Sequence, residues 1–441
     1  MPRTLRTIPP SLAVAALAIA LPGCAPVALY RGPEPAPGAI VAFAGQAQPH
    51  IVAGSTDAAH HFLGVLETPH HADSLVVLIY GDNRAGGRMQ AHPRLWRGVR
   101  KMSLRNPYKL GRGIVALPAF LVAAIVPTLD FPRDLLAFWT RVPTGGGETR
   151  VLKSLGAQPP ADLVISSGDL VTWGDRGRLW ERFVARHSGL RSRALFLAAP
   201  GNHELTADST ARLNWARAMG PPARQGRFWY ALDVPQAEAR FVFLDSNALR
   251  DTLPGATALA EEELAWADSV LAAGPRLRFV VFHHPLLSAG HYRNPWSSDH
   301  PASLPAQRRA RLLELCAARN VTAIFAGHEH MYQRVYVEST HGGFWNITSA
   351  GGGAPLYVLD PKIRDLELAK PLPPGLRIAP ASVYARSTYH FCRLVLPSAG
   401  PAERPLSLEV LRVKGGGRSE VMDRIDIARP PAAAAGVRAS P

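Results

Sequence analysis

The sequence has few cysteines, few charged residues and no internal repeat of fixed period. Three cysteines in 441 residues exclude a disulfide-stapled miniprotein. Charged residues make up 19% of the chain and hydrophobic residues 47%, a balance too apolar for a disordered protein. Acidic residues are outnumbered, so the formal net charge is +15, and almost all of the basic residues are arginine. Charge alone identifies no partner, and the length allows one large α/β domain with attachments.

The N-terminal residues 1–23 have the composition of a secretory signal peptide. Two arginines precede an apolar run at 11–21 that is too short to span a membrane. The run ends in Leu-Pro-Gly-Cys, which resembles a bacterial lipobox, whose cysteine is lipidated and becomes the mature N-terminus. We therefore expect an extracytoplasmic protein anchored to a bacterial membrane through Cys24. In similar lipoproteins an aspartate after the cysteine retains the protein at the inner membrane, so Ala25 at this position favours the outer membrane. A plain signal peptide with an incidental cysteine is the alternative.

The remaining chain divides by composition. Residues 24–55 are rich in proline, as expected for an extended tether. Residues 56–428 predict one folded domain, and the alanine- and proline-rich tail 429–441 predicts no structure. Within the domain, an insert at 88–144 starts with a basic stretch that has no acid and continues with an uncharged one. This composition is typical of an element that lies on a membrane surface, and a helical cap packed over the site is the alternative.

Short apolar runs recur through the expected domain. Most are continuously apolar, which predicts strands buried on both faces. Amphipathic stretches at 261–273 and 306–319 predict helices between them, and alternating residues within 389–427 predict antiparallel strands that complete a second sheet. The pattern indicates a layered α/β domain. The expected buried strands are 74–80, 162–166, 194–198, 240–244, 278–282, 321–326 and 343–348.

Five of these strands end abruptly in polar residues. Strands in an open α/β sheet direct their carboxyl ends to one crevice, so we expect a single site. Carboxylate, amide and imidazole ligands without clustered thiolates favour Fe, Mn or Zn. The five endings are Gly81-Asp82-Asn83-Arg84, Gly168-Asp169, Gly201-Asn202-His203-Glu204, His283-His284-Pro285 and Gly327-His328-Glu329-His330.

The order of these endings resembles that of the calcineurin-like metallophosphoesterase superfamily, in its purple-acid-phosphatase-like branch. The family pattern is GD, GD, GNH with Glu or Asp, a His before x-Pro, and GHxH, and the resemblance covers about residues 74–355. It implies a four-layer sandwich of two mixed β-sheets flanked by helices. It also implies hydrolysis of phosphate esters by two divalent or trivalent transition metal ions, Fe, Mn or Zn, with a bridging hydroxide as nucleophile.

The resemblance also implies roles for individual residues. The metal ligands would be Asp82 and His330 at the first position, Asn202, His283 and His328 at the second, and Asp169 between them. His203 would stabilise the transition state or protonate the leaving oxygen, and Glu204 would orient His203.

Two positions depart from the family pattern. Arg84 stands where many members have the histidine of Asp-x-His, and Thr172 where purple acid phosphatases have tyrosine. Arginine stays protonated and offers no lone pair to a metal. The first metal position is therefore weak, mononuclear-like, or completed by water, Asn83, His284 or a residue of the insert. Arg84 is expected to bind the substrate phosphate through its planar fork, or to form a structural salt bridge with a carboxylate that is not itself a metal ligand.

Several other polar residues have competing interpretations. His284 is read as a satisfied core imidazole in preference to a ligand, and Asp245 as a residue that bonds a neighbouring loop. Three further side chains either line the substrate crevice or lie in surface loops: His291, His300 and Tyr332. Two cysteines remain in the expected exported domain, Cys316 and Cys392. They either form a disulfide with each other or stay as buried thiols.

The leading hypothesis is a lipid-anchored, metal-dependent phosphoesterase. Its expected partners are a phosphate-ester substrate and a membrane, reached through Cys24 and, in one interpretation, the insert 88–144. A binding or scaffold lipoprotein that has kept the fold and weakened its catalysis is the alternative, favoured by Arg84 and Thr172. Nucleic acid is not expected as a partner, although the basic charge leaves a nuclease as a third interpretation.

Overall fold

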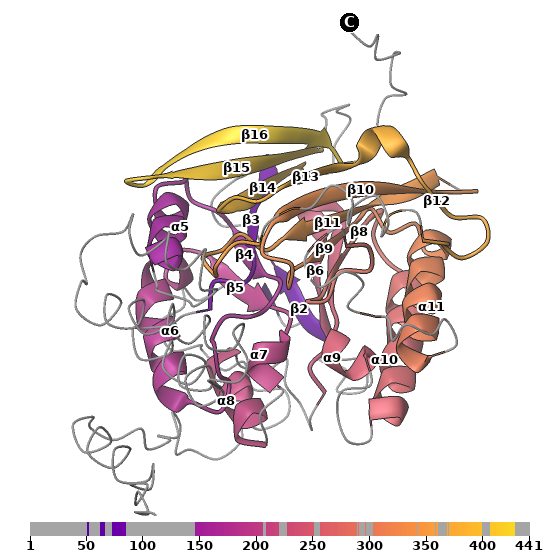
Figure 1. Ribbon diagram of the computed structural model, residues 1–441, viewed down its shortest axis with the longest axis horizontal. Coiled ribbons are helices and arrows are strands. Elements are labelled where there is room, and N and C mark those ends of the chain that lie inside the picture. The colour runs from indigo at the N-terminus through magenta and orange to yellow at the C-terminus, as the bar shows by residue number, and fades with distance from the viewer. Residues whose placement is uncertain are drawn as a thin grey trace, which may run out of the picture.

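Two β-sheets face each other in the computed structural model, and helices cover the outer face of each (Figure 1). Apart from a few single residues, the structure describes 51–52, 62–66, 73–84, 146–205, 209–219, 227–250, 256–288, 303–340, 342–357, 370–398 and 406–427. The expected signal peptide 1–23, the insert 88–144 and the tail 429–441 lie outside the described residues, as do Cys24, His291 and His300.

The smaller sheet has the strand order β16-β15-β14-β3-β4-β5. Its N-terminal half is parallel: β3 (Ser74–Tyr80) pairs with β4 (Leu163–Ser166), and β4 with β5 (Leu195–Ala198). The C-terminal strands extend it by antiparallel pairing. These strands are β14 (His390–Pro397), β15 (Ser407–Gly415) and β16 (Arg418–Asp426).

The larger sheet has the order β1-β2-β6-β7-β8-β9-β11-β10-β12, with β13 also paired to β10. The neighbours β7, β8, β9 and β11 run parallel, whereas β6–β7 and β10–β11 are antiparallel. The strands are β1 (Ile51–Val52), β2 (Phe62–Leu66), β6 (Tyr230–Val234), β7 (Ala239–Phe243), β8 (Leu277–Val281), β9 (Ala323–Ala326), β10 (Tyr332–Ser339), β11 (Gly342–Ser349), β12 (Arg377–Ile378) and β13 (Tyr384–Arg386). Because β1 pairs with β2, this sheet begins before residue 56.

Three hydrophobic cores hold the layers together. Alternate residues of each central strand point to opposite sides, so Val77 and Ile79 of β3 enter the core between the sheets, while Leu78 and Tyr80 pack under the helices. This explains why the strand is continuously apolar. Outward-facing residues of the larger sheet, such as Val280, form the third core with its helices.

The helices occupy the two outer layers. Figure 1 shows α5, α6 and α8 beside the smaller sheet and α10 and α11 beside the larger one. Ser303 caps α11 by accepting a hydrogen bond from the Ala306 amide, with a proline in the first turn. The bounds are α5 (Gly146–Gly156), α6 (Gly177–Arg191), α7 (Asn202–Leu205), α8 (Ser209–Met219), α9 (Ser246–Leu249), α10 (Ala256–Ala272) and α11 (Leu304–Ala318), with short 3₁₀ turns η2 (Pro235–Ala237) and η3 (Pro380–Ser382).

The predicted fold class, two mixed sheets flanked by helices, is confirmed. The C-terminal strands complete the smaller sheet, as expected. Cys316 and Cys392 are both buried free thiols, the first on α11 and the second between the sheets. Among the helices in the described part of the chain, none combines the length and apolarity needed to cross a bilayer.

Candidate active site

The five polar strand endings meet where the two sheets come together at their carboxyl edges. Within the smaller sheet, the Asp82 amide donates to the Gly168 carbonyl at 2.9 Å. Between the sheets, the His328 amide donates to Asp82 Oδ2 at 2.9 Å, and His283 Nδ1 lies 2.8 Å from the Ser167 carbonyl oxygen. Residues more than 200 positions apart in the chain therefore share one buried site.

The backbone of this site is held in an unusual conformation. Four non-glycine residues of the strand endings have positive φ angles: 59° at Asp82, 44° at Arg84, 55° at Asp169 and 70° at His328. A non-glycine residue in this region costs roughly 1–3 kcal/mol and persists only where its surroundings impose it. Such strain clusters at functional sites, and here it turns each side chain toward the junction of the sheets.

A glycine at each turn allows the chains to approach one another. A Cβ atom on Gly168, whose φ is +99°, would lie 2.7 Å from the Gly201 nitrogen. A Cβ atom on Gly352 would lie 2.2 Å from the Gly81 carbonyl oxygen. The same oxygen accepts a hydrogen bond from the Gly352 amide at 2.9 Å. The triple-glycine run after the last motif therefore packs directly against the first motif.

Four lone-pair atoms converge on one point of the site. Asn202 Oδ1 lies 3.1 Å from His283 Nε2 and 3.0 Å from His328 Nδ1, and those two nitrogens are 3.3 Å apart. Asp169 Oδ1 is 3.3 Å from the same His283 nitrogen. His283 Nδ1 faces a carbonyl, which only accepts, so its proton lies there and Nε2 keeps its lone pair. One proton on His328 cannot satisfy all these contacts, whereas a transition metal ion would, so the donor set fits a metal.

The second part of the site contains Asp82 and His330. His330 Nδ1 lies 2.6 Å from the Pro355 carbonyl, which leaves Nε2 facing Asp82 Oδ1 at 3.4 Å. Tyr357 stacks on the imidazole with ring centroids 4.1 Å apart. Burial raises the pKa of Asp82 to about 7, although His283 and Arg84 oppose this effect. Asp82 Oδ1 is buried without a hydrogen-bond partner.

Arg84 forms a buried ion pair with the central carboxylate of the site. Its Nε and Nη2 donate to Asp169 Oδ2 at 3.3 and 3.2 Å, and its side chain is 3% exposed. Burial alone would raise the pKa of Asp169, but the charges of His283, His203 and Arg84 outweigh burial and hold that pKa well below its usual range. Arg84 therefore forms a salt bridge, but with the expected bridging ligand Asp169 and not with a carboxylate outside the ligand set. Binding of a substrate phosphate by Arg84 stays a prediction.

His203 lies at the edge of the site and is 8% exposed. Its Nδ1 is 2.7 Å from the Thr172 carbonyl, and its Nε2 is 3.8 Å from Asp169 Oδ2. The Trp173 ring packs edge-on against the imidazole at 6.1 Å between centroids. Since a carbonyl accepts hydrogen bonds, the Nδ1 proton points to Thr172 and Nε2 points to the site.

Glu204 has a different contact set from the one expected. Its carboxylate accepts hydrogen bonds from the backbone amides of Asp169 and Gly201, both at 2.8 Å, and of Val171 at 3.1 Å. Burial, followed by the charge of Asp169, raises the pKa of Glu204 to about 8. Glu204 therefore ties two strand endings together, and the hydrogen bond that orients the His203 ring comes from the Thr172 carbonyl.

Two of the residues with competing interpretations are structural. His284 Nδ1 lies 2.8 Å from Ser246 Oγ and its Nε2 2.7 Å from Arg250 Nη1, so both ring nitrogens are engaged as in a core imidazole. Tyr332 was expected in the crevice or a surface loop, but it lies buried in β10 and donates to Asp423 at 2.8 Å. The alternation within β10 places this ring between the sheets.

Asp245 has a structural role, as expected, but its side chain bonds its own turn and reaches the neighbouring loop only through Asn247. It caps α9 by accepting from the Asn247 amide at 3.0 Å, and it also accepts from the Asn247 side chain. The Asn247 side chain in turn donates to the Gly201 carbonyl at 3.3 Å, next to Asn202. Four residues around the site were not predicted from the sequence: Asn247, Arg250, Trp173 and Tyr357. Only the polar run after β7 was a signal for the first.

A buried glutamate supports this network and makes its stability depend on pH. Glu263 Oε1 accepts the Asp245 amide at 2.5 Å, while Oε2 is buried without a partner. Burial, followed by the charge of Asp245, raises the Glu263 pKa well above the ordinary 4.5. Above pH 4.5 the folded state therefore binds more protons than the unfolded state, and the free energy of unfolding falls as the pH rises, by up to about 1.4 kcal/mol per pH unit.

We expect Glu263→Gln to remove this dependence. The amide keeps an acceptor for the Asp245 amide and cannot ionise, so the variant should lose less stability than the unmodified chain between pH 5 and pH 8. Urea unfolding across that range measures the difference. Glu262→Gln, on the exposed side of α10 at 42% exposure, is the matched control. Parallel pH profiles for all three proteins would contradict the prediction.

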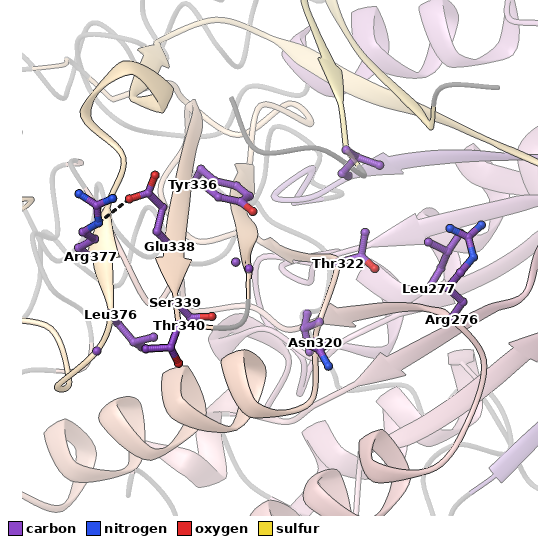
Figure 2. A pocket seen from close by; sticks show the side chains of 15 residues that line it. Arg276, Leu277, Asn320, Thr322, Tyr336, Glu338, Ser339, Thr340, Leu376 and Arg377 are labelled. Atoms are coloured by element: carbon purple, nitrogen blue, oxygen red, sulfur yellow. Dashed lines mark ion pairs between the residues drawn. The ribbon is translucent and has the colours of Figure 1, made fainter. Parts of the chain in front are cut away.

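A pocket of about 830 Å³ lies at the opposite edge of the larger sheet (Figure 2). Its lining includes Leu277 at the start of β8 and Thr322 just before β9, whereas His283 and His328 follow the ends of those strands. Arg377 and Glu338 form an ion pair beside it at 2.6 Å. None of the predicted site residues lines this pocket.

A comparison with solved structures finds matches at low sequence identity. They include the purple acid phosphatase PPD1 from yellow lupin (Lupinus luteus) seeds, with 17% identity over 82% of this chain and 57% of that chain and a TM-score of 0.46. GAP50, the anchor in the inner membrane complex of Plasmodium, has 14% identity over 80% and 88%, with a TM-score of 0.42. PhoD has 8% identity over 81% and 70%, with a TM-score of 0.45. The chain thus spans less than two thirds of the lupin phosphatase.

The sequence itself also matches a known family. A comparison with curated proteins finds no match. The family model of Calcineurin-like phosphoesterase matches residues 148–332, a segment that holds Asp169, Asn202, His203, Glu204, His283, His328 and His330. Asp82 and Arg84 precede this segment and reach the same site through β3. Residues 148–332 of this chain are therefore similar to the calcineurin-like phosphoesterase family.

Proposed function

We propose that this protein hydrolyses phosphate esters with the help of a bound transition metal ion. The observation that supports this most is the convergence of Asp169 Oδ1, Asn202 Oδ1, His283 Nε2 and His328 Nδ1 beside His203. Fe, Mn or Zn suits this set of borderline ligands. A metal ion held there would supply a Lewis acid for the phosphoryl group and activate water as the nucleophile.

The protein's own residues position this chemistry. The Ser167 carbonyl fixes the His283 tautomer, so that its Nε2 lone pair points into the site. Asn247 holds the Gly201 carbonyl next to Asn202. His203, oriented by the Thr172 carbonyl, presents Nε2 as the nitrogen from which a proton can pass to the leaving oxygen.

The test is hydrolysis of an aryl phosphate monoester and diester by the chelated chain, before and after resupply of Mn, Fe or Zn. We expect turnover only with metal, and a fall of about 100-fold or more in Asn202→Ala, because loss of an outer-shell partner alone costs about 10–100-fold and Asn202 would be a direct ligand. Thr340→Ala, in the pocket at the opposite edge, should leave turnover unchanged. Metal-independent turnover, or full activity of Asn202→Ala, would overturn the proposal.

A second candidate function is a binding or scaffold protein that has kept the fold. The Arg84–Asp169 ion pair favours it, because arginine replaces a family ligand and engages a carboxylate of the site. The buried and oriented His203 opposes it, since a structural metal site needs no such group. Bound metal without turnover of either ester, at every metal tried, would favour this alternative.

The proposed location is outside the cytoplasm, on a bacterial membrane through lipidated Cys24. This part rests on the sequence of the N-terminus, and the basic insert 88–144 would add membrane contact or cover the site. The arginine-rich insert would also raise the local concentration of an anionic substrate. Fractionation of native cells tests the anchor, because an unmodified chain would stay in the soluble fraction.

A further inference from the structure

Arg84 occupies the sequence position of the histidine in Asp-x-His, and its guanidinium contacts Asp169, the carboxylate expected between two metal ions. Three contacts tie it to one residue: Nε and Nη2 donate to Asp169 Oδ2 at 3.3 and 3.2 Å, and its backbone amide donates to the Asp169 carbonyl at 2.8 Å. The side chain is 3% exposed. The guanidinium is therefore a fixed part of the site.

The two oxygens of the Asp169 carboxylate have different partners. Its Oδ1 lies 3.3 Å from His283 Nε2 and belongs to the cluster that also contains Asn202 and His328. Its Oδ2 accepts two hydrogen bonds from Arg84. In a two-ion centre, each oxygen of a bridging carboxylate would bind one metal ion. Here the guanidinium supplies the positive charge beside Oδ2 of Asp169.

Among the described residues, few others are candidates to hold an ion at the first position. Asp82 and His330 face each other at 3.4 Å between Oδ1 and Nε2. His284, a candidate to complete the position, has both ring nitrogens bonded to Ser246 and Arg250. Asn83 donates its amide nitrogen to the Leu170 carbonyl at 3.0 Å. An ion at this position would also meet the like charge of the guanidinium, which cannot be deprotonated.

The backbone keeps Arg84 in place. Its φ of 44° and the φ of 59° at Asp82 are both left-handed, and the Asp82 carbonyl accepts the Ala354 amide at 2.8 Å. The loop after β3 is thus bonded to the Asp169 loop on one side and to the glycine-rich loop on the other. A swing of the guanidinium out of the site would break a buried, charge-assisted pair.

We propose that the Arg84 guanidinium takes the place of the first metal ion, so that the centre holds one transition metal ion, bound by Asp169, Asn202, His283 and His328. This inference deepens the proposed function and rests on it for the phosphate-ester substrate, whereas the number of ions does not depend on activity. The expected two-ion centre becomes a centre with one ion and one built-in organic cation.

The experiment measures metal content in the full chain and in Arg84→His, which restores the Asp-x-His pattern. After loading with Mn²⁺ or Zn²⁺ and removal of loosely bound metal, elemental analysis should give one ion per unmodified chain and two per Arg84→His chain. With Mn²⁺, the electron paramagnetic resonance spectrum should change from that of an isolated ion to that of an exchange-coupled pair. Arg377→His, which adds a histidine at a position that is 79% exposed on β12, should keep the unmodified stoichiometry.

Two ions in the unmodified chain would overturn the inference and point to Asn83 Oδ1, buried without a hydrogen-bond partner, as the completing ligand. One ion in a folded Arg84→His chain would also overturn it, because the arginine would then not be what excludes the second ion. Thermal melting checks that the Arg84→His variant is folded. The Arg84→Lys variant keeps the positive charge without the planar guanidinium, so it should bind one metal ion per chain. One ion without turnover would refute only the proposed function, and two ions with turnover only this inference.

Discussion

Replacing Asp169 with asparagine should remove tightly bound metal and destabilise the folded chain in one step. Asparagine keeps the shape of the side chain but not its charge. One carboxylate oxygen accepts the His203 backbone amide at 3.0 Å and the other accepts Arg84. Whichever way the amide is turned, its nitrogen donor faces another donor, and Arg84 is left as a buried charge without its partner.

The expected loss of stability is about 3–5 kcal/mol, the usual cost of breaking a buried ion pair by removal of one member. Urea unfolding of the metal-free proteins measures it, and elemental analysis measures the loss of metal. The double variant Asp169→Asn with Arg84→Gln is the control: it removes the stranded charge, so it should regain stability without regaining metal. An Asp169→Asn chain that is as stable as the unmodified chain and retains metal would contradict the prediction.

Replacing His203 with alanine should slow hydrolysis most for esters with poor leaving groups. The His203 ring is fixed by the Thr172 carbonyl and directs Nε2 toward the site. A positioned general acid contributes roughly 10²–10⁴-fold, and its contribution shrinks when the leaving oxygen needs no proton. We therefore expect a fall of that size with phenyl phosphate and a smaller one with nitrophenyl phosphate.

Steady-state kinetics with a series of substituted phenyl phosphates measures this difference. Metal content should stay unchanged in His203→Ala, which separates proton transfer from a structural role. The nearby Thr172→Val variant retains the carbonyl that orients the ring and should behave like the unmodified chain. An equal fall for every leaving group would contradict proton donation and favour stabilisation of the transition state.

Much of the fold could be predicted from the amino-acid sequence because local patterns determine it. Residues 74–80 are continuously apolar because one face of the strand packs against the other sheet and the opposite face packs under helices. The observed strand β3 covers the same residues. The alternation within 389–427 predicted the antiparallel strands β14, β15 and β16. The pairing of β1 with β2 had no comparable signal, since two residues carry no period.

The candidate site could be predicted as a set of strand endings but not as a set of contacts. Polar residues at the ends of apolar runs identified Asp82, Asp169, Asn202, His283 and His328, and the structure brings them together. The partners of Glu204 could not be predicted, because three backbone amides from two loops reach its carboxylate only after the strands have paired. The stacking of Tyr357 on His330 could not be predicted either, because it also forms only in the folded chain.

The sequence by itself determined the layered α/β architecture, the positions of the polar turns and the absence of a histidine at position 84, since these depend on residue type and on neighbours along the chain. Only the tertiary structure decided which carboxylate Arg84 meets and which carbonyl orients His203. A charge has no preferred partner along the chain. Its partner is whichever opposite charge the packing of two sheets buries beside it, where exclusion of water makes the pairing strong.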